Sequence, residues 1–483
     1  MKNIIKVSIV ACLFLCTSIG HGQDLRLDSL SKKAYDALWG LETPVQLGKS
    51  HAGITQIYVQ SLHLALYTIL REDKNELARY EGQYDELEVL IHKNEDSESH
   101  IFLRSEMLLH YAFVQLKYHN ELSAGWAIRK SYKLAQKGNT DYPDYVPLIK
   151  TVAIHNIIMG SVPKKYDWIM SILGLEGNID KGLTLLRDVY QIESPLSREC
   201  KALYNLIKAY VKNDYSQPHN PISIPESPLS NLVKGLIYLK TNSNELAIPQ
   251  LEKLGIYQAK YPLLSYLMGE SRLRSGELTK AKNNYNRFIN TSMGLANIKD
   301  SYFKISLIYH LSENSDSTQY YMRLASKKGK EISEADQYAA KVIDHNRLPH
   351  PKILKIRLLT DGGYYNDAEK LITDLNQESF QDFADKLEFQ YRSARLLHKQ
   401  SKIEQAERFY LSVIEQSATK GNYLAPNSCL QLGYIYRGKK KYEKAEYYFK
   451  RVKEYSGHEY KNSIDQKAKT ALQSLPESLL DVR

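Results

Sequence analysis

Cysteine is scarce in this chain, and its scarcity limits how the fold can be stabilised. Only four of the 483 residues are cysteines, and two of them, Cys12 and Cys16, lie near the start. The other two, Cys200 and Cys429, are far apart in apolar, helical surroundings. We therefore expect two buried thiols with no disulfide between them. The fold then depends on helix packing alone.

Glycine, proline and long apolar runs are also few. With 24 glycines, 15 prolines, 43% apolar and 25% charged residues, the composition excludes disordered and fibrous chains. The nearest candidate for a membrane span in the mature chain extends from Leu148 to Met159, but Lys150 and His155 interrupt it. It predicts a buried core helix and no transmembrane span.

Signatures of catalysis are missing as well. The sequence has no P-loop, no dinucleotide-binding glycine fingerprint, no nucleophile elbow and no HExxH zinc helix. Glu270 and Ser271 form a pair of the kind used by helical lytic transglycosylases, but no glycine-rich partner motif follows. His345 and His350 share a loop without a third ligand nearby. We predict a protein that is not an enzyme, with no catalytic residue, no metal site and no cofactor.

The positive charge is spread rather than concentrated. The formal net charge is +10, and the one dense basic run, from Arg437 to Lys441, falls in a predicted turn between two helices. A run of this kind is typical of solvated surface, so we predict no binding to nucleic acid. Weak peripheral attraction to anionic lipid or polysaccharide stays open.

The first residues have the pattern of a targeting segment. Lys2 and Lys6 precede an apolar run from Val7 to Cys16, and small residues follow up to Gly22. This pattern predicts a signal peptide over residues 1–22 and export to the periplasm or cell envelope. The alternative is a lipoprotein, because the residues before Cys12 resemble a lipobox, but lipidation there would cut the apolar run to a stub.

A repeat of 34 residues is the most informative pattern present. Gly235 and Ala247 recur as Gly269 and Ala281, with matching apolar residues between them. This period is that of tetratricopeptide helical hairpins, in which the glycine and the alanine permit close helix crossings. The clearest further copy extends from Cys429 to Val452 and contains Gly433, Tyr436, Ala445 and Phe449 at the expected positions.

These copies divide the chain. The chain resembles exported bacterial tetratricopeptide-repeat (TPR) proteins, and the fold class that this implies is all-α, a right-handed superhelix or α-solenoid of TPR-like hairpins. The spacings between Ala368, Ala406 and Ala445 are wider than 34 residues, which predicts an irregular superhelix. We expect a signal peptide at residues 1–22 and a divergent TPR-like helical region at 23–212. A proline-rich linker or loop at 213–228 would precede a TPR repeat region at 229–476 and a tail at 477–483.

One N-terminal segment is more specific than its surroundings. Trp168, Gly174, Gly177 and Gly182 follow one another within residues 162–186, where the glycines would turn the chain and permit a tight helix crossing. This segment resembles the tetratricopeptide repeat protein 39 group. The resemblance implies an adaptor that binds a partner and brings no catalytic residue.

The concave face of the repeats is the predicted binding surface. On the better repeats, aromatic, acidic and arginine side chains of the first helices point into the groove. The candidate partner-binding residues are Tyr266, Glu270, Arg274, Tyr391, Arg395, Tyr434 and Arg437. We predict an exported scaffold that binds a protein or peptide partner in a cell-envelope assembly. The alternative is an envelope carrier or binder of a small amphiphile or glycan.

Overall fold

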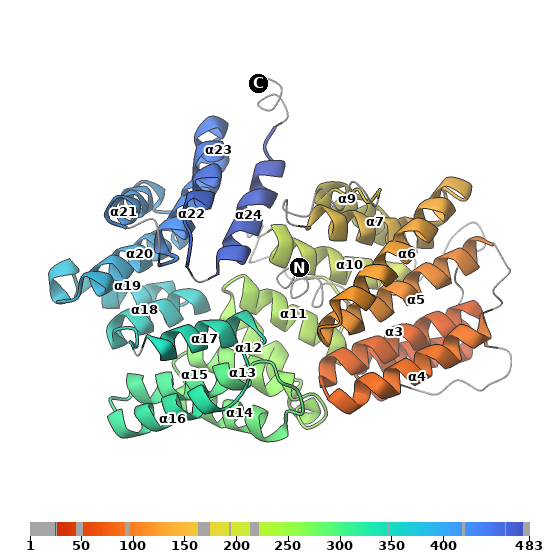
Figure 1. Ribbon diagram of the computed structural model, residues 1–483, viewed down its shortest axis with the longest axis horizontal. Helices are drawn as coiled ribbons and strands as arrows, with labels where there is room; N and C mark the ends of the chain where they lie inside the picture. The colour runs from red at the N-terminus through yellow and green to blue at the C-terminus, as the bar shows by residue number, and fades with distance from the viewer. Residues whose placement is uncertain are drawn as a thin grey trace. The chain divides into compact units, whose positions relative to one another are not determined.

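The computed structural model describes residues 25, 27–44, 52–91, 97–162, 174–192, 195–212, 222–345, 347–417, 421–458 and 460–476 (Figure 1). Every regular element of two or more turns in these ranges is a helix, and none is a β-strand. The predicted fold class, an all-α repeat solenoid, is confirmed. The predicted signal peptide and the C-terminal tail lie outside the described residues.

The chain divides into two compact units. Unit 1 contains residues 1–237, 253–263 and 292–294, and unit 2 contains the rest. The division falls inside α11 (Pro228–Lys240), after the segment 213–228 that we predicted as a linker. Of that segment, residues 222–227 are described and are not helical, whereas its last residue, Pro228, begins α11.

Unit 1 consists of antiparallel helices with long apolar faces. Its helices are α2 (Ser29–Trp39), α3 (Ile54–Arg71), α4 (Lys74–Leu90), α5 (Glu98–Lys117), α6 (Glu121–Asp141), α7 (Val146–Gly160), α9 (Ile179–Gln191) and α10 (Pro195–Ile207), which a short π-helical turn, Lys208–Lys212, extends. Helix α5 packs on α6, and α7 packs on α9. The crossing of α7 and α9 is close because Gly182 has no side chain. A Cβ there would lie 2.6 Å from the Ala153 carbonyl oxygen, so the predicted tight crossing is confirmed.

A buried polar cluster interrupts the apolar core of unit 1. The run from Leu148 to Met159 forms buried α7, as predicted, and its Lys150 is fully enclosed. Lys150 Nζ lies 2.9 Å from Glu106 Oε2 and 3.0 Å from Glu199 Oε1, and it donates to the Tyr58 hydroxyl at 2.8 Å. Burial raises the pKa of Glu199 well above its usual range. The two neighbouring carboxyl groups offset the free-energy cost of enclosing this lysine in an apolar helix.

Unit 2 is a succession of helical hairpins. Its helices are α12 (Asn244–Glu252), α13 (Leu263–Arg274), α14 (Leu278–Thr291), α15 (Ile298–Leu311), α16 (Ser315–Lys327), α17 (Glu334–Asp344), α18 (Pro351–Gly362), α19 (Tyr365–Thr373), α20 (Phe383–Lys399), α21 (Ile403–Gln416), α22 (Leu424–Gly438), α23 (Tyr442–Arg451) and α24 (Lys461–Gln473). The hairpins α15–α16, α18–α19, α20–α21 and α22–α23 each pack helix on helix. The second helix of one hairpin also packs on the first helix of the next, as α14 does on α15 and α21 on α22.

The small residues of the repeat occupy the helix crossings. Ala281, Ala406 and Ala445 have no exposed surface. A Cβ on Gly433 would lie 2.3 Å from Phe449 Cε1, and a Cβ on Gly269 would lie 2.9 Å from Tyr285 Cε1. In each hairpin the glycine thus leaves room for an aromatic ring of the second helix.

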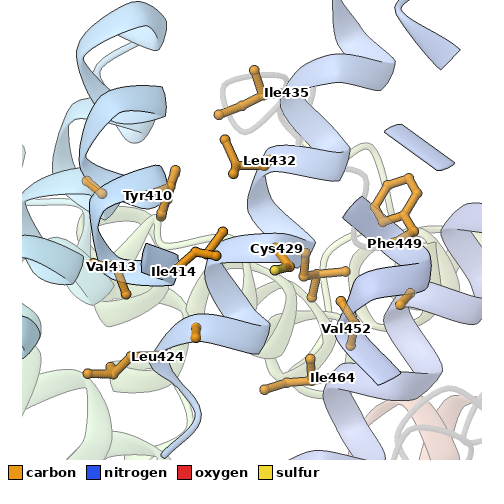
Figure 2. Packing of buried hydrophobic residues seen from close by; sticks show 14 of the residues in the cluster. Tyr410, Val413, Ile414, Leu424, Cys429, Leu432, Ile435, Phe449, Val452 and Ile464 are labelled. Carbon is orange, nitrogen blue, oxygen red and sulfur yellow. The ribbon is translucent and has the colours of Figure 1, made fainter. Parts of the chain in front are cut away.

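The core of the last hairpins is continuous. Cys429, Leu432 and Phe449 meet side chains of α21 and the start of α24 in one buried cluster (Figure 2). Cys200 and Cys429 are both buried and free, as expected from their surroundings. The basic run was predicted to lie in a turn between two helices. Its lysines do so, because α22 ends at Gly438 and Lys440 adopts a left-handed turn conformation with φ of 56°.

Replacing Gly433 with alanine tests this packing. The added Cβ would overlap the Phe449 ring, so the Gly433→Ala variant should lose about 1 to 3 kcal/mol of unfolding free energy. Urea unfolding followed by circular dichroism measures the loss. Gly438→Ala, in the same helix, is the matched control, because a Cβ there has no neighbour within 4 Å. Equal stability of the two variants would contradict the assignment of Gly433 to a close crossing.

Candidate partner-binding groove

Unit 2 contains a cavity of about 280 Å³. Its lining comes from α13, α15, α17 and α18, and Tyr460 completes it just before α24. Its lining includes apolar and aromatic residues, among them Phe303, Leu307 and Leu354, together with seven charged residues. A lining that combines apolar and charged side chains is typical of recognition sites.

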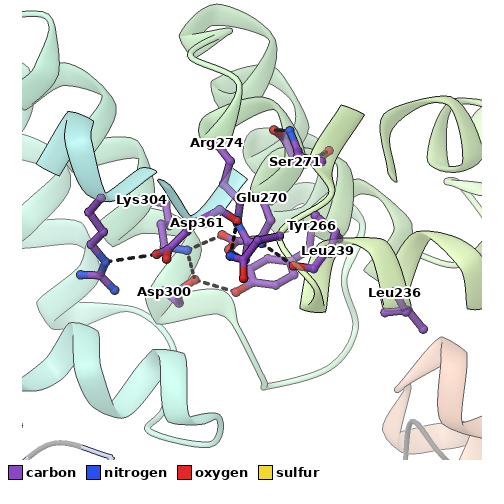
Figure 3. Close-up of polar contacts among 12 residues, drawn as sticks. Leu236, Leu239, Tyr266, Glu270, Ser271, Arg274, Asp300, Lys304 and Asp361 are labelled. Atoms are coloured by element: carbon purple, nitrogen blue, oxygen red, sulfur yellow. Dashed lines mark hydrogen bonds and ion pairs between the residues drawn. The ribbon is translucent and has the colours of Figure 1, made fainter. Parts of the chain in front are cut away.

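One wall is a chain of alternating acids and bases, drawn in Figure 3. Glu270 accepts hydrogen bonds from Lys304 and from the Tyr285 hydroxyl, and it lies 3.6 Å from Arg274. Lys304 Nζ is 3.4 Å from Asp300 Oδ2, and the Tyr266 hydroxyl donates to the same oxygen at 2.8 Å. The chain joins α13 to α15, so it fixes two successive hairpins at the cavity wall.

The two carboxyl groups of this wall differ in acidity. Burial alone would raise the pKa of Glu270, but Lys304 and Arg274 outweigh it and lower the pKa to about 2. Asp300 is more deeply buried, with 1% of its side chain exposed. Burial, with a smaller contribution from Glu270, raises the pKa of Asp300 to about 6 even though Lys304 opposes the rise. Asp300 is therefore the wall group whose charge is least well compensated.

Another part of the lining consists of two tyrosines and one arginine. Arg357 donates to the Tyr338 hydroxyl at 3.1 Å and lies over the Tyr338 ring, 5.3 Å from its centroid. Tyr338 stacks on Tyr460 with ring centroids 5.5 Å apart. Arg357 Nε also lies 3.7 Å from Asp361 Oδ2. Tyrosine rings thus belong to the cavity lining, and the ring of Tyr338 already holds a cation.

Three of the seven predicted partner-binding residues, Tyr266, Glu270 and Arg274, line this cavity. The other four lie along α20 and α22. Tyr391 is packed into the core with 2% of its surface exposed. Arg395 donates to Gln431 Oε1 at 2.8 Å, and Arg437 donates to Ser474 Oγ at 2.8 Å.

Tyr434 has two described ring contacts. Its ring meets Phe449 edge-on, and Arg437 lies over it. Of the four residues on α20 and α22, Arg395 and Arg437 therefore contact a later helix or its cap, whereas these contacts of Tyr434 lie within its own hairpin. Partner binding by the seven residues stays a prediction.

Several lining residues were not predicted, although the period could have located two of them. Asp300 and Lys304 each lie 34 residues after their partners Tyr266 and Glu270, and so occupy the equivalent positions of the next repeat. The repeat that contains Asp300 and Lys304 lacks the glycine and alanine consensus, so its register with the preceding repeat was not recognised from the sequence. Tyr460 precedes the last helix, where no repeat pattern applies.

Other predicted features have structural roles. His350 caps α18 by accepting a hydrogen bond from the Lys352 amide, and its ring meets Phe380 edge-on. No cluster of three or more candidate metal ligands occurs in the described ranges. None of the helices described combines the length and hydropathy needed to cross a membrane.

Comparison with known proteins agrees with the helical hairpins. Residues 426–458, which include α23 and most of α22, match the family described as tetratricopeptide repeat. No curated protein sequence matches the chain. The family match and the packing of glycine against aromatic rings support a TPR protein, a class that typically forms non-catalytic scaffolds for protein interaction. The resemblance of residues 162–186 to the tetratricopeptide repeat protein 39 group stays a prediction, and residues 163–173 lie outside the described ranges.

Solved structures of low similarity include two helical-repeat proteins. Human IFIT1, solved as a dimer with m7Gppp-AAAA, is 13% identical with a TM-score of 0.34, over 89% of this chain and 95% of that chain. The TPR domain of P58(IPK) is 16% identical with a TM-score of 0.23, over 88% of this chain and 99% of that chain. At these TM-scores the likeness carries no inference about ligands.

The raised pKa of Asp300 predicts a specific pH dependence. Because the pKa in the folded protein, about 6, exceeds the ordinary value of 3.8, the native state binds this proton more strongly than the unfolded chain. The stabilising contribution is full below pH 4 and is lost as the pH rises through 6. Asp300→Asn removes this loss, so its stability relative to the wild type should rise between pH 4 and 7, by on the order of 2 kcal/mol.

Urea unfolding of both proteins across this pH range measures the effect. Asp367→Asn, which removes an exposed carboxylate of α19, is the matched control and should show no comparable rise. A constant difference between wild type and Asp300→Asn would show that Asp300 ionises as it does in the unfolded chain.

Proposed function

We propose that this protein is an exported scaffold that binds a protein or peptide partner through the groove of unit 2, in a cell-envelope assembly. The observation that carries the proposal is the cavity lined by paired charges and tyrosines on α13, α15, α17 and α18. Tyrosine and arginine are the side chains that most often anchor protein interfaces. The repeat match at residues 426–458 supports the same reading, because stacked hairpins present such grooves to partners.

The size and polarity of the cavity favour a polypeptide over an amphiphile. A volume of about 280 Å³ is at the lower limit of small-molecule sites, and it suits a single side chain of a larger partner. An amphiphile would need a continuous apolar lining, whereas seven charged residues line this one. The rival function, an envelope carrier or binder of a small amphiphile or glycan, would have to use another surface.

The location outside the cytoplasm rests on the N-terminal sequence. Lys2, Lys6 and the apolar run that follows have the order of a cleavable signal, and the first 24 residues lie outside the described ranges. N-terminal sequencing of the mature protein should find Gln23 first. A lipidated Cys12 at the N-terminus would replace this assignment with a membrane-anchored form.

A matched pair of charge reversals tests the groove. Asp361 lines the cavity, and Asp367 is an exposed aspartate on the following helix, α19. Cross-linking in the envelope fraction and affinity recovery should identify one dominant protein partner. Asp361→Lys should then weaken binding of the purified partner by about tenfold or more, and Asp367→Lys by less than about twofold.

Isothermal titration calorimetry with the purified partner gives both affinities, and circular dichroism confirms that both variants are folded. Equal affinities would place the binding surface outside the groove. Recovery of only lipid or glycan from the envelope fraction would favour the rival function.

A further inference from the structure

We infer that the cavity of unit 2 receives the cationic end of a lysine or arginine side chain of the partner, with the Asp300 carboxylate as its acceptor. This inference rests on the proposed function and adds the chemistry that the groove recognises. Three observations support it: a buried carboxylate oxygen that accepts no hydrogen bond, lining cations that already have partners, and aromatic residues in the lining.

The first observation is an unused hydrogen-bond acceptor. Asp300 lines the cavity with 1% of its side chain exposed. Its Oδ2 accepts from Tyr266 and faces Lys304, but within the described part of the chain its Oδ1 accepts no hydrogen bond. A buried carboxylate oxygen without a donor costs free energy. A ligand that brings an N–H group to this oxygen removes that cost, and a positively charged donor does so most strongly.

The second observation is that the cations of the lining already have partners. Arg274 donates to the Leu239 carbonyl oxygen and faces Glu270. Lys304 is bound to Glu270, while Arg357 is held by Tyr338 and Asp361. These cations are fixed within the wall and are poorly placed to capture an anion.

The acids of the lining are less fully paired. The lining contains four acids, Glu270, Asp300, Glu334 and Asp361, against three cations. Lys240, which is not part of the lining, adds a positive charge near Glu334 and Arg274. Among the four lining acids, Asp300 is the one with a buried carboxylate oxygen that accepts no hydrogen bond in the described part of the chain.

The third observation is the aromatic part of the lining. Tyr266, Phe303, Tyr338 and Tyr460 line the same cavity, and Arg357 already lies over one of these rings. The faces of tyrosine and phenylalanine attract ammonium and guanidinium groups, most strongly where water is excluded. The aliphatic stem of a lysine or arginine would pack on the apolar residues of the lining while its charged end reaches Asp300.

The ionisation of Asp300 supports this occupant. Asp300 faces Lys304 on its own helix, Tyr266 and Glu270 on α13, and Asp336 on α17. Burial and the two other carboxylates raise its pKa to about 6, against the opposing effect of Lys304. A cation in the cavity would lower this pKa and release a proton, so its binding should be tighter at pH 7.5 than at pH 5.

Side-chain analogues test the inference on the full chain before any partner has been purified. The probes are n-butylammonium and N-methylguanidinium for the cationic ends, propionate for an anionic end, and n-butanol for an apolar one. Calorimetric titration at low ionic strength should show saturable binding of the cationic probes only. Binding of propionate in preference to both cations would overturn the inference.

The variant Asp300→Asn tests the acceptor. It keeps an oxygen that can accept from Tyr266 and removes the charge, so the affinity for n-butylammonium should fall by about tenfold or more. Asp367→Asn, on the exposed side of α19, should bind the probe as the wild type does. Unchanged binding by Asp300→Asn would overturn the assignment.

A measurement on the wild type guards against failure of the variant to fold. Titration at pH 6 in buffers of different ionisation enthalpy should show release of a fraction of a proton when n-butylammonium binds. Binding without proton release would exclude Asp300 as the acceptor.

Competition identifies the source of the cation. If n-butylammonium displaces the partner recovered from the envelope, the occupant is a side chain of that partner. If the probe binds without displacing the partner, the site takes a free amine and the inference fails while the proposed scaffold function stands. If the partner binds the groove and no cationic probe binds, only the chemistry inferred here is wrong.

Discussion

Contact between successive hairpins is the constraint on which unit 2 depends. A single pair of helices is too thin to bury its own apolar face, so each pair must pack against the next one. The absence of a side chain at Gly269 and Gly433 lets an aromatic ring of the second helix approach the first. Hydrogen bonds and ion pairs between first helices, such as those from α13 to α15, then fix the angle between neighbouring hairpins.

The same contacts give the groove its chemistry. Side chains on the first helices face both the next hairpin and the cavity, so most of their polar groups are used for structure. The pairs Tyr266–Asp300 and Glu270–Lys304 connect equivalent positions of successive repeats, and Arg437 donates to Ser474 at the end of α24. A ligand can use only the hydrogen-bond acceptors that these pairs leave unsatisfied. Asp300 Oδ1 is such an acceptor. A wall fixed in this way is preorganised for a partner, which lowers the cost of ordering on binding.

Much of the fold could be predicted from the sequence because the repeat places small residues where helices cross. Gly182, Gly269 and Gly433 all proved to stand at close approaches, and Cys200 and Cys429 are buried thiols. The site was less predictable, since a position on the concave face does not say whether a side chain faces a ligand or the next repeat. Tyr391 illustrates this limit, because its place in the repeat is that of a groove residue and its ring lies in the core.

Charge burial was the other part that the sequence did not reveal. Lys150 looked like an interruption of an apolar run, yet it is the centre of a cluster whose acids come from α5 and α10. Asp300 carries no repeat consensus, and its raised pKa arises from burial and from Glu270 on another helix. Such groups are brought together by tertiary packing, so residue spacing along one helix gives no sign of them.

A double-mutant cycle on Glu270 and Lys304 tests most directly whether groove side chains hold successive hairpins together. The unfolding free energies of Glu270→Gln, Lys304→Met and the double variant give the coupling between the two residues. The exposed pair Asp367–Lys370, within one helix, provides the reference. Our account predicts a coupling of about 1 to 3 kcal/mol for Glu270–Lys304 and less than about 0.5 kcal/mol for the reference pair. A coupling near zero between Glu270 and Lys304 would contradict it.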